Sequence, residues 1–382
     1  MSRGNITRRG KRSWRLKFDG GTDAAGNRQT RYVTVKGKLQ DAQRELTKLL
    51  VAVDAGTLVE PSRTTVAEYI RGWLDGPHGL AAKTAERYRE LAERQIIPHL
   101  GAVLLQKLRP KQVQTWHATL LQSDAATGRV LSARTVGHAH RVLHRVLAHA
   151  MAAEEVSRNV ASAVRPPKVT AKEIEILTAD QVTIVLERMQ GHPLYSIAAL
   201  ALATGMRRGE LLALQLRDVD LDGASLQVER SLEETAAGLQ FKPPKTQHGR
   251  RTISLPAHAV AVLRTHWRQQ LECRAALGLG KPEPETLIFS KPDGSPLSPD
   301  NLSRDWGRAC RSLSLPEVSF HALRHTHASA LIASKLDVVQ IARRLGHGSP
   351  VITLRTYAHL FEASDSAAAA AIENVLRPQK GR

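Results

Sequence analysis

The segment LGHGSPVITLRTYAHL, residues 345–360, has the pattern of one helix ending and another beginning. Gly346 is the type of residue expected just after a helix, because glycine readily takes the left-handed backbone that closes the last turn. Ser349 and Pro350 are preferred residues for the cap and the first position of the following helix. The segment therefore predicts two helices joined by a short loop.

This loop and the second helix bring a histidine and a tyrosine into one short segment. Tyr357 is one of only five tyrosines in the chain, and it stands ten residues after His347, which falls in the predicted loop. No acidic residue lies between them. The tyrosine is either a packing residue or a reactive hydroxyl group, and the rest of the chain has to decide between these two interpretations.

The chain as a whole is strongly basic. Its 382 residues include 55 Lys and Arg against 36 Asp and Glu, a formal net charge of +19. Such a charge favours nucleic acid as a partner ahead of an anionic membrane. No apolar run is long enough to span a bilayer, the basic N-terminus lacks the apolar stretch of a signal peptide, and two cysteines provide neither a disulfide framework nor a cysteine zinc site. We expect a cytoplasmic, nucleoid-associated protein with no membrane partner.

Two linker-like stretches divide the chain into three predicted domains. Residues 1–57 show two strand-like stretches followed by a helical pattern, which indicates a small ββα or βββα unit rich in basic residues. Residues 65–158 show only helical periodicity. Residues 172–382 mix helices with strands. The predicted fold class is therefore mainly α with small β-sheets (α+β).

Capping residues and apolar spacing place the elements of the middle and last domains. The middle domain is expected to have four helices. The first begins at Thr65, which forms a capping box with Glu68, and the second begins after Thr84 and ends near Pro98. The third begins near Pro110 and the fourth at Ser132. The last domain is expected to have a helix capped by Thr178 and Gln181, an apolar helix ending at 204–205, strands within 225–231, 238–245 and 250–256, and a helix at 366–376.

Basic residues occupy marked positions at separate points of the last domain. Arg207 stands in TGMRRGELL at the expected start of a helix, where a guanidinium beside free backbone N–H groups makes an anion site, and Glu210 lies on the same helix face. His321 and Arg324 are three residues apart and share a helix face. A lysine beside a predicted hairpin lies in KPPKTQHGRR. Each feature alone is more often an ordinary surface side chain.

Together these segments resemble the tyrosine recombinase (phage integrase) family. The pattern of that family is an Arg in T-G-x-R-x-x-E, a hairpin Lys, H-x-x-R, L-G-H, and a Tyr about ten residues later. The residues of this chain that match it, in order, are Arg207, Lys245, His321, Arg324, His347 and Tyr357. The resemblance covers about 175–365. The segment 65–158 looks like the core-binding domain of the family, and 1–57 resembles the arm-type DNA-binding domain of longer integrases.

The resemblance implies a site-specific recombinase that integrates or excises a mobile element by cutting and rejoining DNA through a 3′-phosphotyrosyl intermediate. Tyr357 would be the nucleophile, and the phosphotyrosyl bond would conserve the energy of the cut strand without ATP. Arg207 and Arg324 would stabilise the charge of the phosphorane transition state. Because guanidinium groups do this work in the family, no metal and no cofactor is expected, and the absence of a spaced Asp/Glu cluster agrees with that.

The remaining site residues would handle protons. The resemblance implies that Lys245 protonates the departing 5′ oxygen, that His321 assists proton transfer, and that His347 donates a hydrogen bond to the phosphate. Lys242 competes with Lys245, which is preferred because the KT pair precedes GRR and a strand. Arg208 competes with Arg207, but its place matches a variable position of the pattern.

Other histidines are assigned less specific roles. His325 and His327 are expected to be packing residues or to support their catalytic neighbours. A second group lies on the helix expected from residue 132 and includes i, i+4 pairs that allow zinc ligation; it comprises His138, His140, His144 and His149. Without a zinc motif or a neighbouring carboxylate, these four are better explained as helix-surface or DNA-facing residues.

The implied partners are double-stranded DNA at att-type recombination sites and further copies of the chain, as a tetramer on DNA. DNA-bending and excisionase proteins are expected helpers. Three other functions use related features: a catalytically silent DNA-binding regulator with the same fold, a topoisomerase with the same chemistry, and a metal-dependent transposase. The complete set of six residues argues against the first, the extra basic N-terminal unit against the second, and the missing acidic triad against the third.

Overall fold

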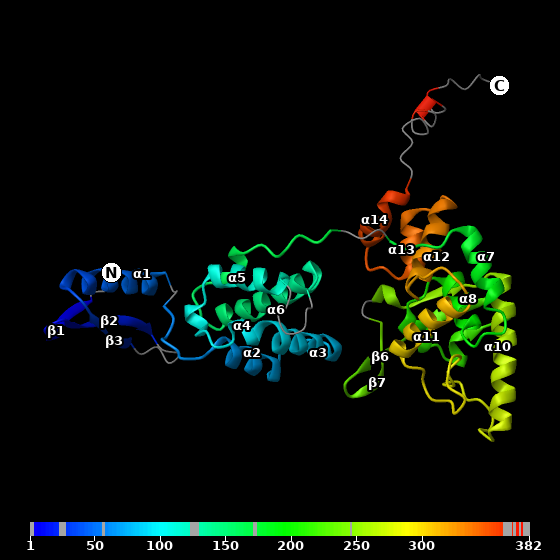
Figure 1. The fold of residues 1–382 in the computed structure, drawn as a ribbon, viewed down its shortest axis with the longest axis horizontal. Helices are drawn as coiled ribbons and strands as arrows, with labels where there is room; N and C mark the ends of the chain where they lie inside the picture. The colour runs from blue at the N-terminus through cyan, green and yellow to red at the C-terminus, as the bar shows by residue number, and fades with distance from the viewer. Residues whose placement is uncertain are drawn as a thin grey trace. The chain divides into compact units, whose positions relative to one another are not determined.

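The computed structural model describes residues 4–22, 28–55, 58–122, 130–170, 174–244 and 247–361, together with single positions at 369, 372, 373 and 376. The chain divides into two compact units, Met1–Ala171 and Lys172–Arg382 (Figure 1). Across the described ranges, no helix combines the length and apolarity needed to cross a membrane. The predicted helix at 366–376 falls mostly outside the described residues.

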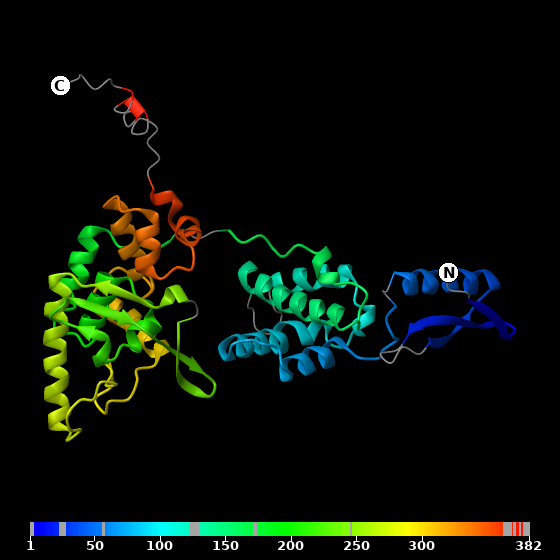
Figure 2. The same cartoon turned by 180° about the vertical axis from the view of Figure 1, so that it is seen from behind.

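The first unit begins with a three-stranded antiparallel sheet and one helix. In chain order these elements are β1 (Asn5–Gly10), β2 (Ser13–Thr22), β3 (Arg28–Lys36) and α1 (Leu39–Asp54), and the strand order is β1-β2-β3. Leu16 and Phe18 on β2 are buried on the face against which α1 packs (Figure 2). The βββα form of the prediction is thus confirmed, with β1 as the third strand.

The opposite face of this sheet is polar. Residues paired directly across strands share a face, so Arg15 lies with Thr7 and Thr34, and Lys17 lies with Asn5 and Tyr32. The Arg15 guanidinium carbon lies 4.1 Å from the centroid of the Tyr32 ring, a cation–π contact on a ring that is 51% exposed. This face therefore presents basic and hydrogen-bonding side chains to solvent.

The rest of the first unit is helical. Its elements are α2 (Val66–Asp75), α3 (Ala82–Leu91), a π-helical turn (Ala92–Ile96), α4 (Ile97–Leu100), a 3-10 turn (Leu105–Lys107), α5 (Pro110–Leu121), α6 (Ala133–Ala152) and a second 3-10 turn (Val160–Ala163). The capping box of Thr65 and Glu68 and the cap of Ser132 are confirmed.

One helix of this group differs from its prediction at its start. It begins at Ala82, before Thr84, and after a π-helical turn it ends with α4 at Leu100, near Pro98 as predicted. Pro98 is accommodated because the wide turn lets α4 restart at Ile97, and proline in a first turn lacks only an N–H that is unpaired there anyway.

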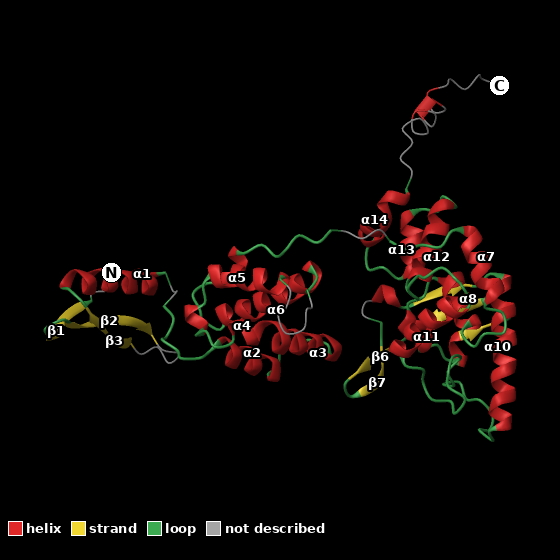
Figure 3. Cartoon of the chain, in the orientation of Figure 1, coloured by secondary structure: helices red, strands yellow, loops and turns green. Residues whose placement is uncertain are grey.

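The second unit combines helices with two small antiparallel sheets (Figure 3). Its elements are α7 (Ala179–Arg188), α8 (Tyr195–Thr204), α9 (Arg208–Leu212), a 3-10 turn (Leu216–Asp218), β4 (Val219–Asp220), β5 (Ser225–Val228), β6 (Ser231–Thr235), β7 (Gly238–Lys242), a 3-10 turn (Gln247–Gly249), β8 (Arg251–Ser254), α10 (Ala257–Ala276), α11 (Pro299–Ser312), α12 (Ala322–Ala333), α13 (Val338–Leu345), α14 (Pro350–Tyr357) and a 3-10 turn (Ala358–Leu360). The fold class predicted from the sequence, mainly α with small β-sheets, is confirmed.

The strands of the second unit pair differently from the simple hairpin expected. One sheet has the order β4-β5-β8, and a separate hairpin joins β6 to β7. The predicted strand 225–231 is interrupted at Glu229 and Arg230, where Arg230 pairs with the buried Asp218 at 2.5 Å (Nη1–Oδ2). This inward ion pair lies between β5 and β6. The sequence pattern predicted the two strands as one.

Two left-handed glycines end the helices that border the pocket described below. Gly205 (φ +65°) ends α8 and Gly346 (φ +67°) ends α13, as the sequence indicates. A Cβ at Gly346 would lie 2.7 Å from Nη1 of Arg251, so a side chain there would collide with this guanidinium as well as strain the backbone. Ser349 and Pro350 then open α14 as predicted.

Candidate active site

Segments far apart in the sequence line one pocket of about 470 Å³ in the second unit. The lining residues are Arg207, Glu210, Ser231, Lys242, Pro243, Pro244, Gly249, His321, Arg324, His325, Gly346, His347, Gly348, Ile352, Thr356 and Tyr357. Five of the six residues singled out from the sequence are therefore brought together. The sixth, Lys245, lies outside the described residues.

Arg324 is held by main-chain carbonyl groups. Its side chain is almost fully buried, at 3% exposure, and it donates from Nη1 to the carbonyl of Gly205 (2.6 Å) and from Nη2 to that of Leu345 (2.7 Å). These carbonyls are at the C-terminal ends of α8 and α13, where the helix dipoles favour a cation. Burial, and then repulsion from Arg207, lowers the pKa of Arg324 to about 9, which leaves it protonated at neutral pH.

A buried carboxylate fixes a second guanidinium at the pocket. Glu210, 3% exposed, accepts from Nη1 of Arg207 at 2.8 Å and from Nη2 of Arg251 at 2.9 Å. Arg207 also donates to the carbonyl of Gly346 (3.2 Å), while 41% of its side chain stays exposed. Burial alone would raise the pKa of Glu210, but Arg251 and Arg207 hold it below its usual value. Arg207 is thus positioned yet accessible.

Arg251 was not singled out from the sequence. Arg251 and Ile253 are two residues apart on β8 and share the face that points toward the interior. The Nε of Arg251 also donates to the carbonyl of Arg344 (2.7 Å). The strand alternation was the available signal, since an arginine at an inward-facing position needs a buried acidic or carbonyl partner.

Tyr357 lies inside the pocket wall. Only 1% of it is exposed, and its hydroxyl lies 2.7 Å from Nδ1 of His325, with the two rings edge to face at 5.6 Å between centroids. Burial raises the pKa of Tyr357 to about 12, so the phenol is protonated at neutral pH. The sequence suggested only a packing or supporting role for His325, and the structure adds a direct hydrogen bond to the reactive candidate.

The two other histidines at the pocket are neutral near pH 7. His321 is an exposed residue, yet its pKa is lowered to about 4 by desolvation and by the nearby His325 and Arg324. His347 has its pKa lowered to about 4 by desolvation and by Arg324, and its Nδ1 lies 2.7 Å from the Thr353 hydroxyl. Neutral imidazoles can each donate one N–H hydrogen bond to an anion.

The competing residues have other partners. Lys242 lines the pocket, but its Nζ lies 2.5 Å from Oε1 of Glu233 on the same hairpin. Arg208 points to α11, where it donates to the Ser303 hydroxyl at 2.5 Å and to Asp300 at 3.2 Å. His327 has a structural role, with Nδ1 2.8 Å from the carbonyl of Leu202.

The histidines of α6 form no metal centre with their described neighbours. Within the described part of the chain, no group of three or more His, Cys, Asp or Glu is placed to hold a metal ion. Instead, Nδ1 of the buried His140 lies 3.1 Å from Nε2 of His117, and His144 lies 3.1 Å from the Ser162 hydroxyl. The expectation of a helix-surface or DNA-facing residue is therefore wrong for His140, which is 5% exposed, whereas His144 is exposed.

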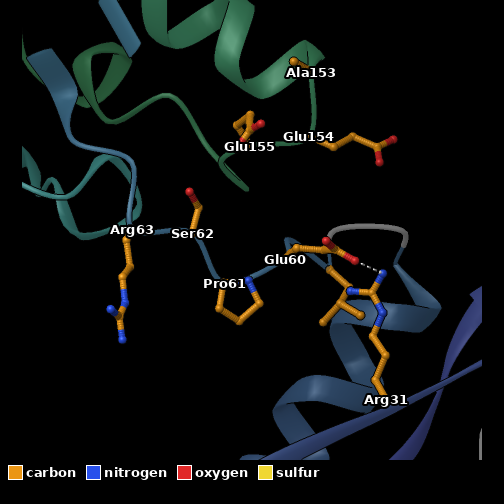
Figure 4. Close-up of a pocket in the computed structure, with 9 residues that line it drawn as sticks. Arg31, Glu60, Pro61, Ser62, Arg63, Ala153, Glu154 and Glu155 are labelled. Carbon is orange, nitrogen blue, oxygen red and sulfur yellow. Dashed lines mark ion pairs between the residues drawn. The ribbon is translucent and has the colours of Figure 1, made fainter. Parts of the chain in front are cut away.

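A larger pocket of about 650 Å³ lies in the first unit (Figure 4). It is lined by Arg31, Leu58, Glu60, Pro61, Ser62, Arg63, Ala153, Glu154 and Glu155. Arg31 pairs with Glu60 at 2.9 Å across its wall, and three carboxylates border it. Because carboxylates repel a phosphodiester, the pocket of the second unit is the better candidate for chemistry on nucleic acid.

Comparison with known proteins identifies the family of the chain. The model of the phage integrase family matches residues 172–364, and that of the phage integrase N-terminal SAM-like domain matches 65–121. An integrase of Streptomyces ambofaciens is 30% identical over 360 residues, covering 90% of this chain and 88% of that relative. The integrase of Mycobacterium phage L5 is 28% identical, covering 83% and 81% of the two chains.

Solved structures share the fold. The Tn1549 transposon integrase in complex with transposon right end DNA superposes with a TM-score of 0.67 at 20% identity, covering 81% of this chain and 99% of that one. The lambda integrase tetramer bound to a Holliday junction gives a TM-score of 0.55 at 19% identity, covering 94% and 97%.

These matches define an integrase-type DNA recombinase. Since the family model for the second unit spans half of the chain, the protein belongs to the phage integrase family. Its function is site-specific recombination, and its enzyme class is that of the tyrosine site-specific recombinases, as the sequence resemblance implied.

The buried carboxylate supplies the first test. Glu210→Gln should lower the free energy of unfolding by about 3–5 kcal/mol at neutral pH, because it leaves Arg251 buried without its charge partner. The pKa of Glu210 is depressed in the folded chain, so its stabilisation is present above its ordinary pKa of 4.5 and is lost as the pH falls. Urea unfolding at about pH 4 should therefore show a smaller difference from wild type than at neutral pH.

A matched control comes from an exposed ion pair. Glu285 pairs with Arg217 at 2.7 Å with both side chains about half exposed. Glu285→Gln should change the free energy of unfolding by less than about 1 kcal/mol. Equal losses in the two variants would contradict the structural role assigned to Glu210.

Proposed function

We propose that the pocket of the second unit is the catalytic site and that Tyr357 is its nucleophile. The observation that carries the proposal is the meeting, in one pocket, of a phenol hydroxyl with the guanidinium groups of Arg207 and Arg324. A phosphodiester seated there would place its nonbridging oxygens against two fixed positive charges. The hydroxyl is the one group of the three that can form a bond to phosphorus.

The proposed reaction is transesterification in both directions. The Tyr357 oxygen attacks the phosphorus, the bond to the 5′ oxygen breaks, and the strand remains attached as a 3′-phosphotyrosine. The 5′ hydroxyl of a second strand then attacks the phosphotyrosine and releases Tyr357. Arg207 and Arg324 stabilise the extra negative charge of the pentacoordinate state, and His347 and His321 donate hydrogen bonds or assist proton transfer.

We assign protonation of the departing 5′ oxygen to Lys245. It follows the β6–β7 hairpin three residues after Lys242, whose ammonium group is already paired with Glu233. An ammonium group held in an ion pair is less free to reach a leaving group. The proposal for Lys245 rests on this contrast and on the family pattern.

We further propose that residues 1–57 bind a second class of DNA site, 65–158 bind the core site and 172–382 carry out the chemistry. The exposed face of the β1–β3 sheet, with Arg15, Lys17 and Tyr32, is suited to a DNA groove and its phosphates. The chain would act on att-type double-stranded DNA as a tetramer, the state in which lambda integrase was solved on a Holliday junction. DNA-bending and excisionase helpers and nucleoid association stay predictions.

Tyr357→Phe provides the decisive test of the mechanism. Phe keeps the ring packing and the net charge, so affinity for DNA should stay within about twofold of wild type, since phosphate contacts dominate it. On a nicked suicide substrate, wild type should accumulate an adduct at the 3′ phosphate with a free 5′ hydroxyl, and the variant should form none. Labelled strands on a denaturing gel and peptide mapping give the readout.

Specific outcomes would overturn this mechanism. An adduct mapped to Tyr195 or to a serine, or unreduced cleavage by Tyr357→Phe, would exclude Tyr357 as the nucleophile. Cleavage that disappears with EDTA and returns with Mg²⁺ would favour a metal-dependent nuclease. DNA binding by wild type without any adduct would favour the catalytically silent regulator.

Lys245 and Lys242 can be separated by leaving-group chemistry. Lys245→Ala should slow cleavage of ordinary DNA by ~10²–10⁴, the usual contribution of a general acid. A substrate with sulfur at the 5′ bridging position needs no proton on its leaving group and should restore most of the rate. Lys242→Ala is the matched control, and rescue of that variant alone would move the role to Lys242.

The sheet can be tested with surface variants that leave its core intact. Arg15→Gln combined with Lys17→Gln should weaken binding to the distal class of DNA site and reduce its salt dependence by a slope of about 2, one for each phosphate contact. Binding at the crossover site should not change. Lys48→Gln, an exposed position on α1, is the control. Equal loss at both classes of site would contradict a separate arm-type domain.

A further inference from the structure

We propose that His325 is a catalytic residue that accepts the proton of the Tyr357 hydroxyl when the nucleophile attacks. The proposal rests on the proposed function, because it assumes that Tyr357 is the nucleophile. It differs from the family pattern, which includes His321 but assigns no role to the position after Arg324. What carries it is the placement of an imidazole nitrogen directly on the hydroxyl group that must lose its proton.

The geometry is that of a base and its acid. Nδ1 of His325 lies 2.7 Å from the Tyr357 oxygen, within the range of 2.6–3.2 Å over which a proton is transferred directly. The two residues come from α12 and α14, and their rings pack edge to face. The His325 ring also contacts that of His321 at 4.7 Å between centroids and an interplanar angle of 88°. The imidazole thus packs against two rings, with its Nδ1 at the hydroxyl.

The charge states of the two groups and the tautomer of His325 set the direction of the hydrogen bond. The phenol keeps its proton near pH 7, since burial raises its pKa to about 12. Burial and the adjacent Arg324 lower the pKa of His325, so its imidazole is neutral. A neutral imidazole has one acceptor nitrogen, and the proposal requires the tautomer with the proton on Nε2, in which Nδ1 accepts from the hydroxyl. In that tautomer the proton acceptor is already in place before DNA binds.

Neighbouring histidines are engaged elsewhere. Nδ1 of His347 lies on the Thr353 hydroxyl, and His321 touches the ring of His325 rather than the phenol. The titratable or charged groups that face His325 are His321 and Arg324 on its own helix, His347 on the loop before α14, and Tyr357 on α14. Within this set, His325 has the nitrogen in contact with the attacking oxygen.

The proposed step balances in atoms and charge. As the bond from the Tyr357 oxygen to phosphorus forms, the phenol proton moves to Nδ1 of His325, and the bond between phosphorus and the 5′ oxygen breaks. The 5′ oxygen takes its proton from the general acid, assigned above to Lys245. In rejoining, the incoming 5′ hydroxyl returns a proton to Lys245, and the imidazolium of His325 returns its proton to the departing phenolate. No oxidant, metal or other reactant is consumed.

His325→Asn tests the proton transfer with the full chain. Asparagine places an amide oxygen near the position of Nδ1, so it keeps a hydrogen-bond acceptor but cannot take up a proton. At neutral pH we expect adduct formation on the suicide substrate to slow ~10²–10⁴-fold. The deficit should shrink as the pH rises, because the variant depends on ionised Tyr357, whereas wild type should have a flat profile above neutral pH.

Two further variants separate a proton acceptor from a purely structural residue. Difluorotyrosine at position 357 has a more acidic phenol, and it should restore much of the rate to His325→Asn, since little proton transfer is then needed. His258→Asn, at an exposed histidine of α10, should match wild type throughout. His325→Gln repeats the test if the asparagine variant fails to fold, as judged by circular dichroism and DNA binding.

The outcomes distinguish this inference from the proposed function. If Tyr357→Phe forms no adduct and His325→Asn cleaves at the wild-type rate, the proposed function stands and His325 is not the proton acceptor. A slow His325→Asn whose deficit neither shrinks with pH nor responds to difluorotyrosine would likewise overturn the proton transfer and leave only a positioning role. An adduct in Tyr357→Phe would instead overturn the proposed function itself.

Discussion

A carboxylate that is 97% buried requires positive charge beside it, and in this protein Glu210 receives two guanidinium groups. One of them, Arg251, is itself buried and ties β8 to the end of α13 through the carbonyl of Arg344. The other, Arg207, reaches the pocket. The arrangement of the site therefore depends on Glu210, which is too deeply buried to contact a phosphate. Without it, Arg207 would lose its fixed position at the pocket and Arg251 would be a buried charge without an acidic partner.

The pocket has a definite excess of charge. The charged lining residues and their ion-pair partners are Arg207, Arg251, Arg324 and Lys242 against Glu210 and Glu233, which leaves two positive charges in excess, while the histidines and Tyr357 are neutral near pH 7. A phosphodiester has one negative charge, and a phosphorane intermediate has more. The pocket is therefore better matched to the transition state of the proposed reaction than to its substrate, which is the condition for acceleration.

Local signals made much of the structure predictable. The glycine and the Ser-Pro pair of 345–360 fixed the loop before α14, and the Thr65–Glu68 pair fixed the start of α2, because caps and turns depend on residues close in sequence. The residues of the pocket were predicted from a family pattern. Helix and strand periodicity did not predict how close these residues lie to one another. Arg251 pairs with Glu210 across 41 residues of sequence, and His325 contacts Tyr357 across 32. The boundary between β5 and β6 was not predicted, because it coincides with the ion pair of Arg230 with Asp218. Short windows of sequence do not identify such long-range partners, although the alternation along β8 marks Arg251 as inward-facing.

The way Arg324 is bound has a consequence for how the chain matures. Its carbonyl partners belong to helix ends 119 residues before it and 21 residues after it, and Arg207 reaches a carbonyl 139 residues further on. Neither guanidinium has its final position until α8, α12 and α13 have packed together, and the phenol follows only with α14. A chain still emerging from the ribosome therefore lacks the complete pocket until α14 has been synthesised and packed. The proposed strand-cutting site is completed only near the end of synthesis, after the basic segments of the first unit have been made.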